Sequence, residues 1–377
     1  MTMWSKNIRY DDPLLERISH PDLGEVYRKW EAGERLNLSD GLICLETEDL
    51  LGLGQMALVA RQARFGNQAF YVVNHHLNYT NVCKNDCKFC AFHRPPGSPD
   101  GYIITPREAA ARIAASPMEG LREVHLVGGC SPDLDLDYYL DLLKAVSRAR
   151  PGVMLKAFTA VEVDHIAQRA GLSWTETLTV LKEAGLSAMP GGGAEVFSPR
   201  IRDLLFPRKI DSQSWLMIHG EAHRLGIHTN ATMLFGHMET PTERIEHLLR
   251  LRAQQDETKG FQAFIPLPFL PANTALAHLP GPSGVEILKT IAVSRLILDN
   301  IPHLKAYWVM LGLKLTQTAL HFGADDLEGT IIQEKIAHQA GAETVQGLNR
   351  VELEDMIIEA GFRPVERDTF HHTVVAS

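Results

Sequence analysis

The stretch that decides the fold is "AFYVVNHHLNYTNVCKNDCKFCAFHR", residues 69–94. It opens with an apolar segment, 69–77, that has the composition of a buried strand. A loop follows directly and holds three of the five cysteines of the chain, Cys83, Cys87 and Cys90, in the spacing C-x3-C-x2-C. Barrel enzymes place their chemistry on loops that follow strands. The stretch therefore predicts a metal-binding or catalytic loop on the first strand of a parallel sheet.

The rest of the chain repeats the alternation of an apolar segment and a helical pattern. Helix starts are marked by Thr105, Ser173 and Thr240, each followed by a glutamate three residues later. Parallel strands joined by helical crossovers predict an α/β protein, and the length of 377 residues favours a (β/α) TIM-type barrel over an open doubly wound sheet. The strands are expected at 69–77, 123–129, 153–159, 186–192, 228–236, 261–267 and 306–311.

Three parts of the chain are expected. Residues 1–66 are predicted to form an N-terminal helical extension, residues 67–330 the barrel, and residues 331–377 a C-terminal segment packed on it. "GLGQMA" (52–57) is a fragment of a dinucleotide-binding fingerprint. We exclude that function because no strand precedes it.

Composition narrows the class of protein. Hydrophobic residues make up 45% of the chain, which permits a large core, and the net charge is −9. An acidic chain without a basic cluster argues against a nucleic-acid or membrane-surface partner. The first residues hold no apolar signal core, so we expect a cytoplasmic protein with reduced thiols. Cysteines clustered in such a chain indicate metal binding or catalysis.

The cysteine loop permits two kinds of metal centre. Thiolates from Cys83, Cys87 and Cys90 can ligate three irons of a cubane cluster. Because Cys44 and Cys130 are isolated in the sequence, the fourth iron would stay open to a small-molecule ligand. Alternatively, His93 completes a Cys3His quartet for structural zinc. Zinc quartets usually hold together small modules without a core, which disfavours the second interpretation here.

The segment "CKNDCKFC" (83–90), with an aromatic residue before the third cysteine, resembles the radical S-adenosylmethionine superfamily. The resemblance implies a [4Fe-4S] cluster whose open iron is chelated by S-adenosylmethionine, which is cleaved to methionine and a 5′-deoxyadenosyl radical. It also implies an electron donor such as flavodoxin or ferredoxin. A homodimer is one oligomeric state to be tested.

Further segments narrow the resemblance. "HLVGGCSPDL", "MPGGGAEVF", "HTNATMLFGHMET" and "FQAFIPLPFLPANT" follow in order. They resemble the group of aminofutalosine synthase, cyclic dehypoxanthinyl futalosine synthase and the radical subunits that build the deazaflavin chromophore. The last two segments are most similar to the aminofutalosine synthase family.

That family is implied to act in the futalosine route to menaquinone. The deoxyadenosyl radical adds to 3-[(1-carboxyvinyl)oxy]benzoate, the ether migrates, carbon dioxide leaves, and S-adenosylmethionine is consumed as a co-substrate. Two alternatives remain: a cyclase or deazaflavin-type hydrogen abstractor and, more distantly, a zinc-stapled barrel without catalysis.

The resemblance also implies residues for the cofactor. Phe89 is expected against the adenine, and Gly128 and Gly129 where the backbone approaches the methionine amino group. Cys130 stands where the superfamily usually has a glutamate. Glu195, after three glycines, is expected to bind the ribose hydroxyls or the ammonium group. The alternatives are packing for Phe89, an ordinary turn for Gly129 and a solvated helix residue for Glu195.

A dicarboxylate substrate requires cationic or hydrogen-bond donor groups. The candidates are His237 beyond the end of a strand, Arg94 just past the cysteine loop, and Arg295 in the apolar helix "IAVSRLIL". A surface position is the alternative for Arg295. The acidic turn with Asp325 and Asp326 is expected near the site or, alternatively, as a helix N-cap.

Overall fold

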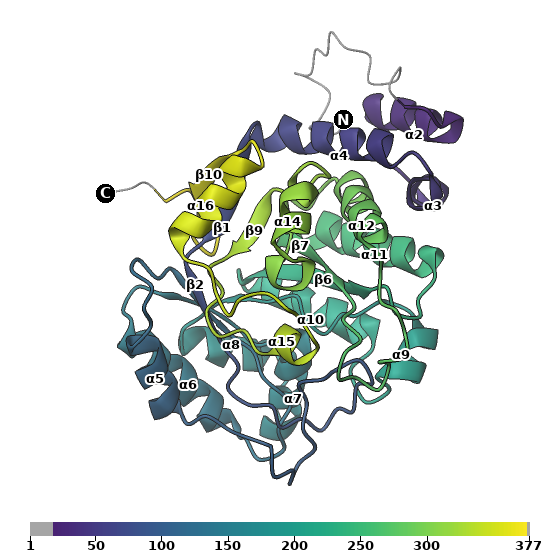
Figure 1. The fold of residues 1–377 in the computed structure, drawn as a ribbon. Coiled ribbons are helices and arrows are strands. Elements are labelled where there is room, and N and C mark those ends of the chain that lie inside the picture. Colours follow the sequence, from purple (N-terminus) through teal and green to yellow (C-terminus); the bar gives the residue numbers. More distant parts are fainter. Residues whose placement is uncertain (1–17, 375–377) are drawn as a thin grey trace.

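The computed structural model of the protein describes residues 18–374. Within them, a seven-stranded sheet runs in chain order, with every neighbouring pair parallel, and curls into a barrel enclosed by helices (Figure 1). This confirms the predicted fold class. The strands are β2 Asn74–Leu77, β3 Glu123–Leu126, β4 Met154–Ala157, β5 Leu186–Met189, β6 His228–Phe235, β7 Phe261–Pro268 and β8 His303–Leu304.

A second, three-stranded sheet completes the barrel. Its order is β10 (Arg363–Glu366), β1 (Gln68–Val72) and β9 (Asp326–Gly329). Single parallel bridges join Lys305 to Asp326 on one side and His75 to Ile332 on the other. Residues around β9 therefore fill the gap between β8 and β2. The predicted first strand, 69–77, is in fact two strands in different sheets.

Helices precede, connect and follow these strands. The three predicted helix starts are confirmed, because Thr105, Ser173 and Thr240 each form a reciprocal capping box with the glutamate three residues on. The helices are α2 Pro21–Glu31, α3 Leu38–Glu46, α4 Leu50–Phe65, α5 Pro106–Ala114, α6 Leu136–Ala149, α7 Ala160–Ala170, α8 Trp174–Glu183, α9 Pro199–Leu205, α10 Ser212–Arg224, α11 Pro241–Thr258, α12 Gly284–Ile297, α13 Trp308–Leu311, α14 Leu313–Leu320, α15 Ile336–Gln339 and α16 Arg350–Glu359. Over the described residues, no helix is both long and apolar enough to cross a bilayer.

The N-terminal part of the described chain is helical, as expected, and Figure 1 shows α2, α3 and α4 together at one end of the molecule. Residues 1–17 of the predicted extension lie outside the described residues. The glycines of "GLGQMA" lie within α4. A methyl group on Gly54 would come within 2.7 Å of the Phe322 ring, so this glycine permits close helix packing.

The strand predicted at 306–311 is wrong. The chain leaves the sheet after Lys305 and Ala306, whose amides still donate to Phe264 and Asp326. Residues 308–311 then form the single turn of α13, and the Trp308 indole donates to the Gly329 carbonyl at 2.8 Å. A short apolar run does not distinguish a buried strand from a buried helical turn.

Candidate active site

The barrel encloses a cavity of about 340 Å3 at the carboxyl ends of its strands. The loops after β2, β3, β4 and β5, the inner faces of β6 and β7, and residues around β9 and α15 line it. The cysteine loop borders the cavity at the strand ends. Deeper in the barrel, the side chains of His76, His125 and Glu328 reach it, and we call these three residues the floor triad.

Backbone hydrogen bonds fix the cysteine loop on the barrel. The Lys84 amide donates to the Cys130 carbonyl at 3.0 Å, and the Gly129 amide donates to Thr80 at 2.9 Å. A methyl group on Gly129 would lie 2.2 Å from the Val82 carbonyl oxygen. The close approach that requires glycine at this position is therefore made by the cysteine loop itself.

The spacing of the three thiols distinguishes the two metal hypotheses. Sulfurs around one tetrahedral zinc lie about 3.8 Å apart, given a Zn–S bond of about 2.3 Å. Among the described residues, the only group of three or more His, Cys, Asp or Glu ligand atoms within 4.8 Å of one another is the floor triad. Cys83, Cys87 and Cys90 are thus too widely spread for one zinc ion and fit a cluster in which each sulfur binds a different iron.

Cys130 contacts the first cluster cysteine. Its amide lies 3.4 Å from Cys83 Sγ. Hydrogen bonds from Cys130 lower the pKa of Cys83 to about 6 despite its burial, which favours the metal-binding thiolate. Cys44, by contrast, is buried in α3. His93 Nδ1 lies 2.8 Å from the Cys90 carbonyl oxygen, and its hydrogen bonding to Cys90 raises the pKa of His93 to about 9.

Phe89 and Glu195 both line the cavity. Glu195 is not the solvated residue of the alternative interpretation, because its buried carboxylate forms an ion pair with Lys209. The Lys209 ammonium also lies 5.5 Å from the ring centroids of Phe89 and Phe206. Burial alone would lower the pKa of Lys209, but the Glu195 carboxylate keeps it above its usual value.

Gly128 and Gly129 also line the cavity. Glu162 lines it as well, although it is not among the residues predicted from the sequence. The Gly128 amide donates to Glu162 Oε1 at 3.0 Å, and the Tyr79 hydroxyl donates to the same oxygen at 2.5 Å. Burial raises the pKa of Glu162. The signal that could have identified it is the capping box of Thr159 and Glu162, which opens α7 just after β4.

Adjacent strands supply the floor triad. His76 on β2 pairs in register with His125 on β3, which pairs with Lys156 on β4. The two imidazole centroids lie 4.4 Å apart. Burial lowers the pKa of His76 to about 3 and that of His125 to about 4, so both rings are neutral near pH 7. Lys305 Nζ lies 2.7 Å from Glu328 Oε2.

Arg295 does not line the cavity. It is buried at the base of the barrel, where it pairs with the buried Asp325 and donates to the carbonyls of Gly323 at 2.7 Å and Pro302 at 3.0 Å. Its donors are therefore used within the protein. This arrangement argues against both the predicted substrate contact and the surface alternative.

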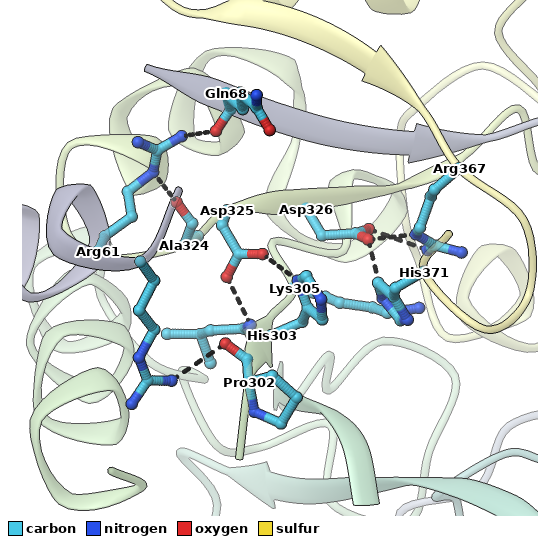
Figure 2. A network of polar contacts seen from close by, with 12 residues as sticks. Arg61, Gln68, Pro302, His303, Lys305, Ala324, Asp325, Asp326, Arg367 and His371 are labelled. Carbon is cyan, nitrogen blue, oxygen red and sulfur yellow. Dashed lines mark hydrogen bonds and ion pairs between the residues drawn. The ribbon is translucent and has the colours of Figure 1, made fainter. Parts of the chain in front are cut away.

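The acidic turn is part of the same buried network. Figure 2 shows Asp325 beside His303, and Asp326 beside Arg367 and His371. Neither aspartate lines the cavity. The pair lies at β9, so the helix N-cap expected as the alternative is wrong as well.

Arg94 and His237 also lie off the cavity wall. Arg94 Nη1 donates to the carbonyls of Ala91 and His93, at 3.0 and 2.9 Å, and so braces the cysteine loop. The His237 ring lies behind Phe269, a cavity residue, with centroids 6.0 Å apart.

The partner of His237 is Glu239. His237 Nδ1 lies 2.9 Å from the Glu239 carboxylate, and Arg244 Nε donates to the same carboxylate at 2.6 Å. Burial alone would raise the pKa of Glu239, but the His237 hydrogen bond and the charge of Arg244 bring it to about 2.

Three spread thiols at the mouth of a parallel barrel, facing an enclosed cavity, define an enzyme that holds an iron–sulfur cluster next to its substrate. The chain belongs to the radical S-adenosylmethionine superfamily. Residues 77–251 match the model described as the Radical SAM superfamily, and residues 258–374 match the CofH/MqnC C-terminal region. Members of the superfamily use a [4Fe-4S] cluster and S-adenosylmethionine, so the zinc interpretation is set aside.

Individual relatives agree with the family. The chain is 44% identical to aminodeoxyfutalosine synthase of Thermus thermophilus over 96% of its own length and 98% of the relative. It is 41% identical to the 5-amino-6-(D-ribitylamino)uracil–L-tyrosine 4-hydroxyphenyl transferase of Methanopyrus kandleri, over 84% and 87% of the two chains. The crystal structure of methylornithine synthase has the same fold, with a TM-score of 0.72 at 19% identity over 90% of this chain and 97% of that one.

Proposed function

We propose that the chain is an aminodeoxyfutalosine synthase. It would join the 5′-deoxyadenosyl group of S-adenosylmethionine to 3-[(1-carboxyvinyl)oxy]benzoate, with rearrangement and decarboxylation, in menaquinone biosynthesis. The observation that carries the proposal is the 44% identity to such a synthase over nearly the full length of both chains. A cavity that runs from the cysteine loop to a polar floor supports it, because donor and acceptor must meet away from water.

The residues around the cysteine loop would hold the cofactors. Cys83, Cys87 and Cys90 would each ligate one iron. The cluster and S-adenosylmethionine, when bound, supply the 5′-deoxyadenosyl radical. Phe89 would pack against the adenine, and Glu195 would accept hydrogen bonds from the ribose hydroxyls or the ammonium group.

The chain's own contacts would prepare this end of the cavity. Lys209 holds the Glu195 carboxylate in place through their ion pair. The Gly128 amide is already bonded to Glu162, which leaves the Gly128 carbonyl for the methionine amino group. Arg94 would position the loop rather than contact the substrate.

His237 would act indirectly. Its ring and the Glu239 carboxylate brace the turn after β6, and Phe269 separates them from the cavity. We therefore assign His237 a role in positioning the Phe269 wall against the aromatic ring of the substrate. The substrate carboxylates would reach the floor triad instead.

The hydroxyphenyl transferase activity is the second candidate, because a relative of that name is 41% identical. The test is an anaerobic reaction of the cluster-loaded chain with dithionite and S-adenosylmethionine. One arm adds the enolpyruvyl benzoate, and the other adds tyrosine with 5-amino-6-(D-ribitylamino)uracil.

The S-adenosylmethionine carries a carbon label in its adenosyl group. The proposed synthase would incorporate this label into a new covalent product in the first arm only. Free 5′-deoxyadenosine formed in step with tyrosine consumption in the second arm would overturn the proposal in favour of the transferase. The Cys90→Ala variant is the control for cluster-independent chemistry.

The proposal also covers the electron donor and the oligomeric state of the chain. A reduced flavodoxin or ferredoxin would serve as donor in the cytoplasm, where the thiols of the cysteine loop stay reduced. Replacing dithionite with each reduced carrier tests the donor. Light scattering of the cluster-loaded chain tests the proposed homodimer.

A further inference from the structure

The floor triad has the composition of a divalent-cation site. His76 and His125 offer imidazole nitrogens and Glu328 a carboxylate oxygen, and the three ligand atoms lie within 4.8 Å of one another. Two histidines and one carboxylate bind first-row divalent cations and leave coordination positions open for another ligand. Ligand atoms around such a cation lie about 3 Å apart, so small side-chain rotations complete the site.

Two of the three triad residues carry a buried polar atom without a hydrogen-bond partner among the described residues, whereas His76 Nε2 lies 3.4 Å from Asn74 Nδ2. Lys305 occupies Glu328 Oε2, whereas Oε1 has no hydrogen-bond partner among the described residues, although Glu328 is only 3% exposed. Lys156 Nζ lies 4.0 Å from Oε1, beyond hydrogen-bond distance. His125 Nδ1 is likewise buried without a described partner. Buried polar atoms without partners are rare, and a bound ion is one of the explanations for them.

The triad also opens toward the substrate, since all three residues line the cavity. The charges of the layer beneath are already balanced, because Lys156 pairs with Glu123 at 2.7 Å and Lys305 with Glu328 at 2.7 Å. Each of these two lysines is thus in an ion pair with a carboxylate, although its ammonium group forms no hydrogen bond among the described residues. A buried carboxylate without a counter-charge costs several kcal/mol.

We propose that His76, His125 and Glu328 bind one first-row divalent cation, such as Mn2+, Zn2+ or Fe2+, whose open positions accept a carboxylate of the substrate. The cation would supply the two positive charges that the floor lacks for a dicarboxylate. The assignment of this carboxylate rests on the proposed function, whereas the cation site itself does not.

Binding of Mn2+ to the full cluster-loaded chain tests the site, with the cluster kept in its oxidised, EPR-silent state. The loss of the six-line EPR signal of free Mn2+ measures binding, and we expect one Mn2+ per chain. His125→Ala should weaken binding more than about tenfold, since losing even an outer-shell partner of a ligand costs about tenfold. His228→Ala is the matched control, because this exposed histidine of β6 does not line the cavity.

The folding of each variant is checked by its cluster absorbance. Glu328→Gln provides a second variant of the triad. Adding the enolpyruvyl benzoate should change the EPR spectrum of bound Mn2+ if a substrate carboxylate joins the coordination shell.

The outcomes separate the two proposals. A chain that forms product but binds no Mn2+, or that binds it equally in His125→Ala, overturns the cation site and leaves imidazole contacts to the substrate. A chain that binds Mn2+ through the triad but forms no adenosylated product keeps the cation site and refutes the proposed function.

Discussion

Replacing Arg295 with methionine distinguishes a structural arginine from a substrate-binding one. Methionine has a similar length and removes the charge without filling the site with a new polar group. The change breaks the buried ion pair with Asp325 and takes a donor from the carbonyls of Gly323 and Pro302. Removing one partner of a buried pair is strongly destabilising because the other charge stays buried.

The structure limits the size of the loss. Asp325 keeps two donors after the substitution, His303 Nδ1 at 2.6 Å and the Leu304 amide at 2.8 Å. We therefore expect the lower end of the range for a broken buried pair, about 3–4 kcal/mol in the free energy of unfolding. An unfolding entropy of about 2.1 cal/mol/K per residue gives about 0.8 kcal/mol/K for 377 residues. The expected fall in Tm is then about 4–5 °C.

Calorimetry measures the Tm, and product formation at a temperature well below it measures kcat and KM. The control is Arg208→Met, since this exposed arginine lies 3.7 Å from Asp86 and should change the Tm by less than about 1 °C. Below the Tm, kcat/KM of the Arg295→Met enzyme should equal that of the wild type. An unchanged Tm with a raised KM for the benzoate would refute the structural role and restore Arg295 to the substrate site.

Three further predictions concern the cluster, the glycine under its loop and the response to acid. Cys83→Ala should lose cluster iron, sulfide and activity, whereas Cys44→Ala should keep all three; full iron and sulfide in the first variant would contradict the assignment. Gly129→Ala should lower cluster occupancy because its methyl group would lie 2.2 Å from a loop carbonyl, whereas Gly284→Ala, with its nearest contact at 3.9 Å, should not. Glu239, whose pKa is about 2 in the folded protein, should contribute about 3 kcal/mol of stability above its unfolded pKa of 4.5, and this is lost as the pH falls from 4.5 to 2. Glu239→Gln should remove that part of the acid-unfolding curve, and a curve parallel to that of the wild type would contradict it.

What the sequence predicted correctly was local. The cysteine spacing, the capping boxes at Thr105, Ser173 and Thr240, and the alternation of strands and helices depend on neighbouring residues. The division of 69–77 into two strands depends on partners far along the chain, so no local pattern reveals it.

The polar part of the site was harder to predict for the same reason. Lys209 meets Glu195 only because the loop after α9 folds back, and Glu328 reaches the cavity from β9. The apolar helix predicts that Arg295 is buried and needs a partner, but no local pattern identifies Asp325, 30 residues further on, as that partner. The domain boundaries at 66/67 and 330/331 remain predictions.

The segment around β9 closes the barrel between β8 and β2, and this closure depends on strands from both ends of the chain. β1 pairs with β9 and with β10, so Gln68 meets Arg363 near the opposite end of the chain. Contacts between such distant residues form slowly, because the loop between them must first close. Until they form, the facing edges of β2 and β8 lack their neighbour, and the interior is open from the side. The barrel is therefore closed on this side only when residues near both ends of the chain have come together.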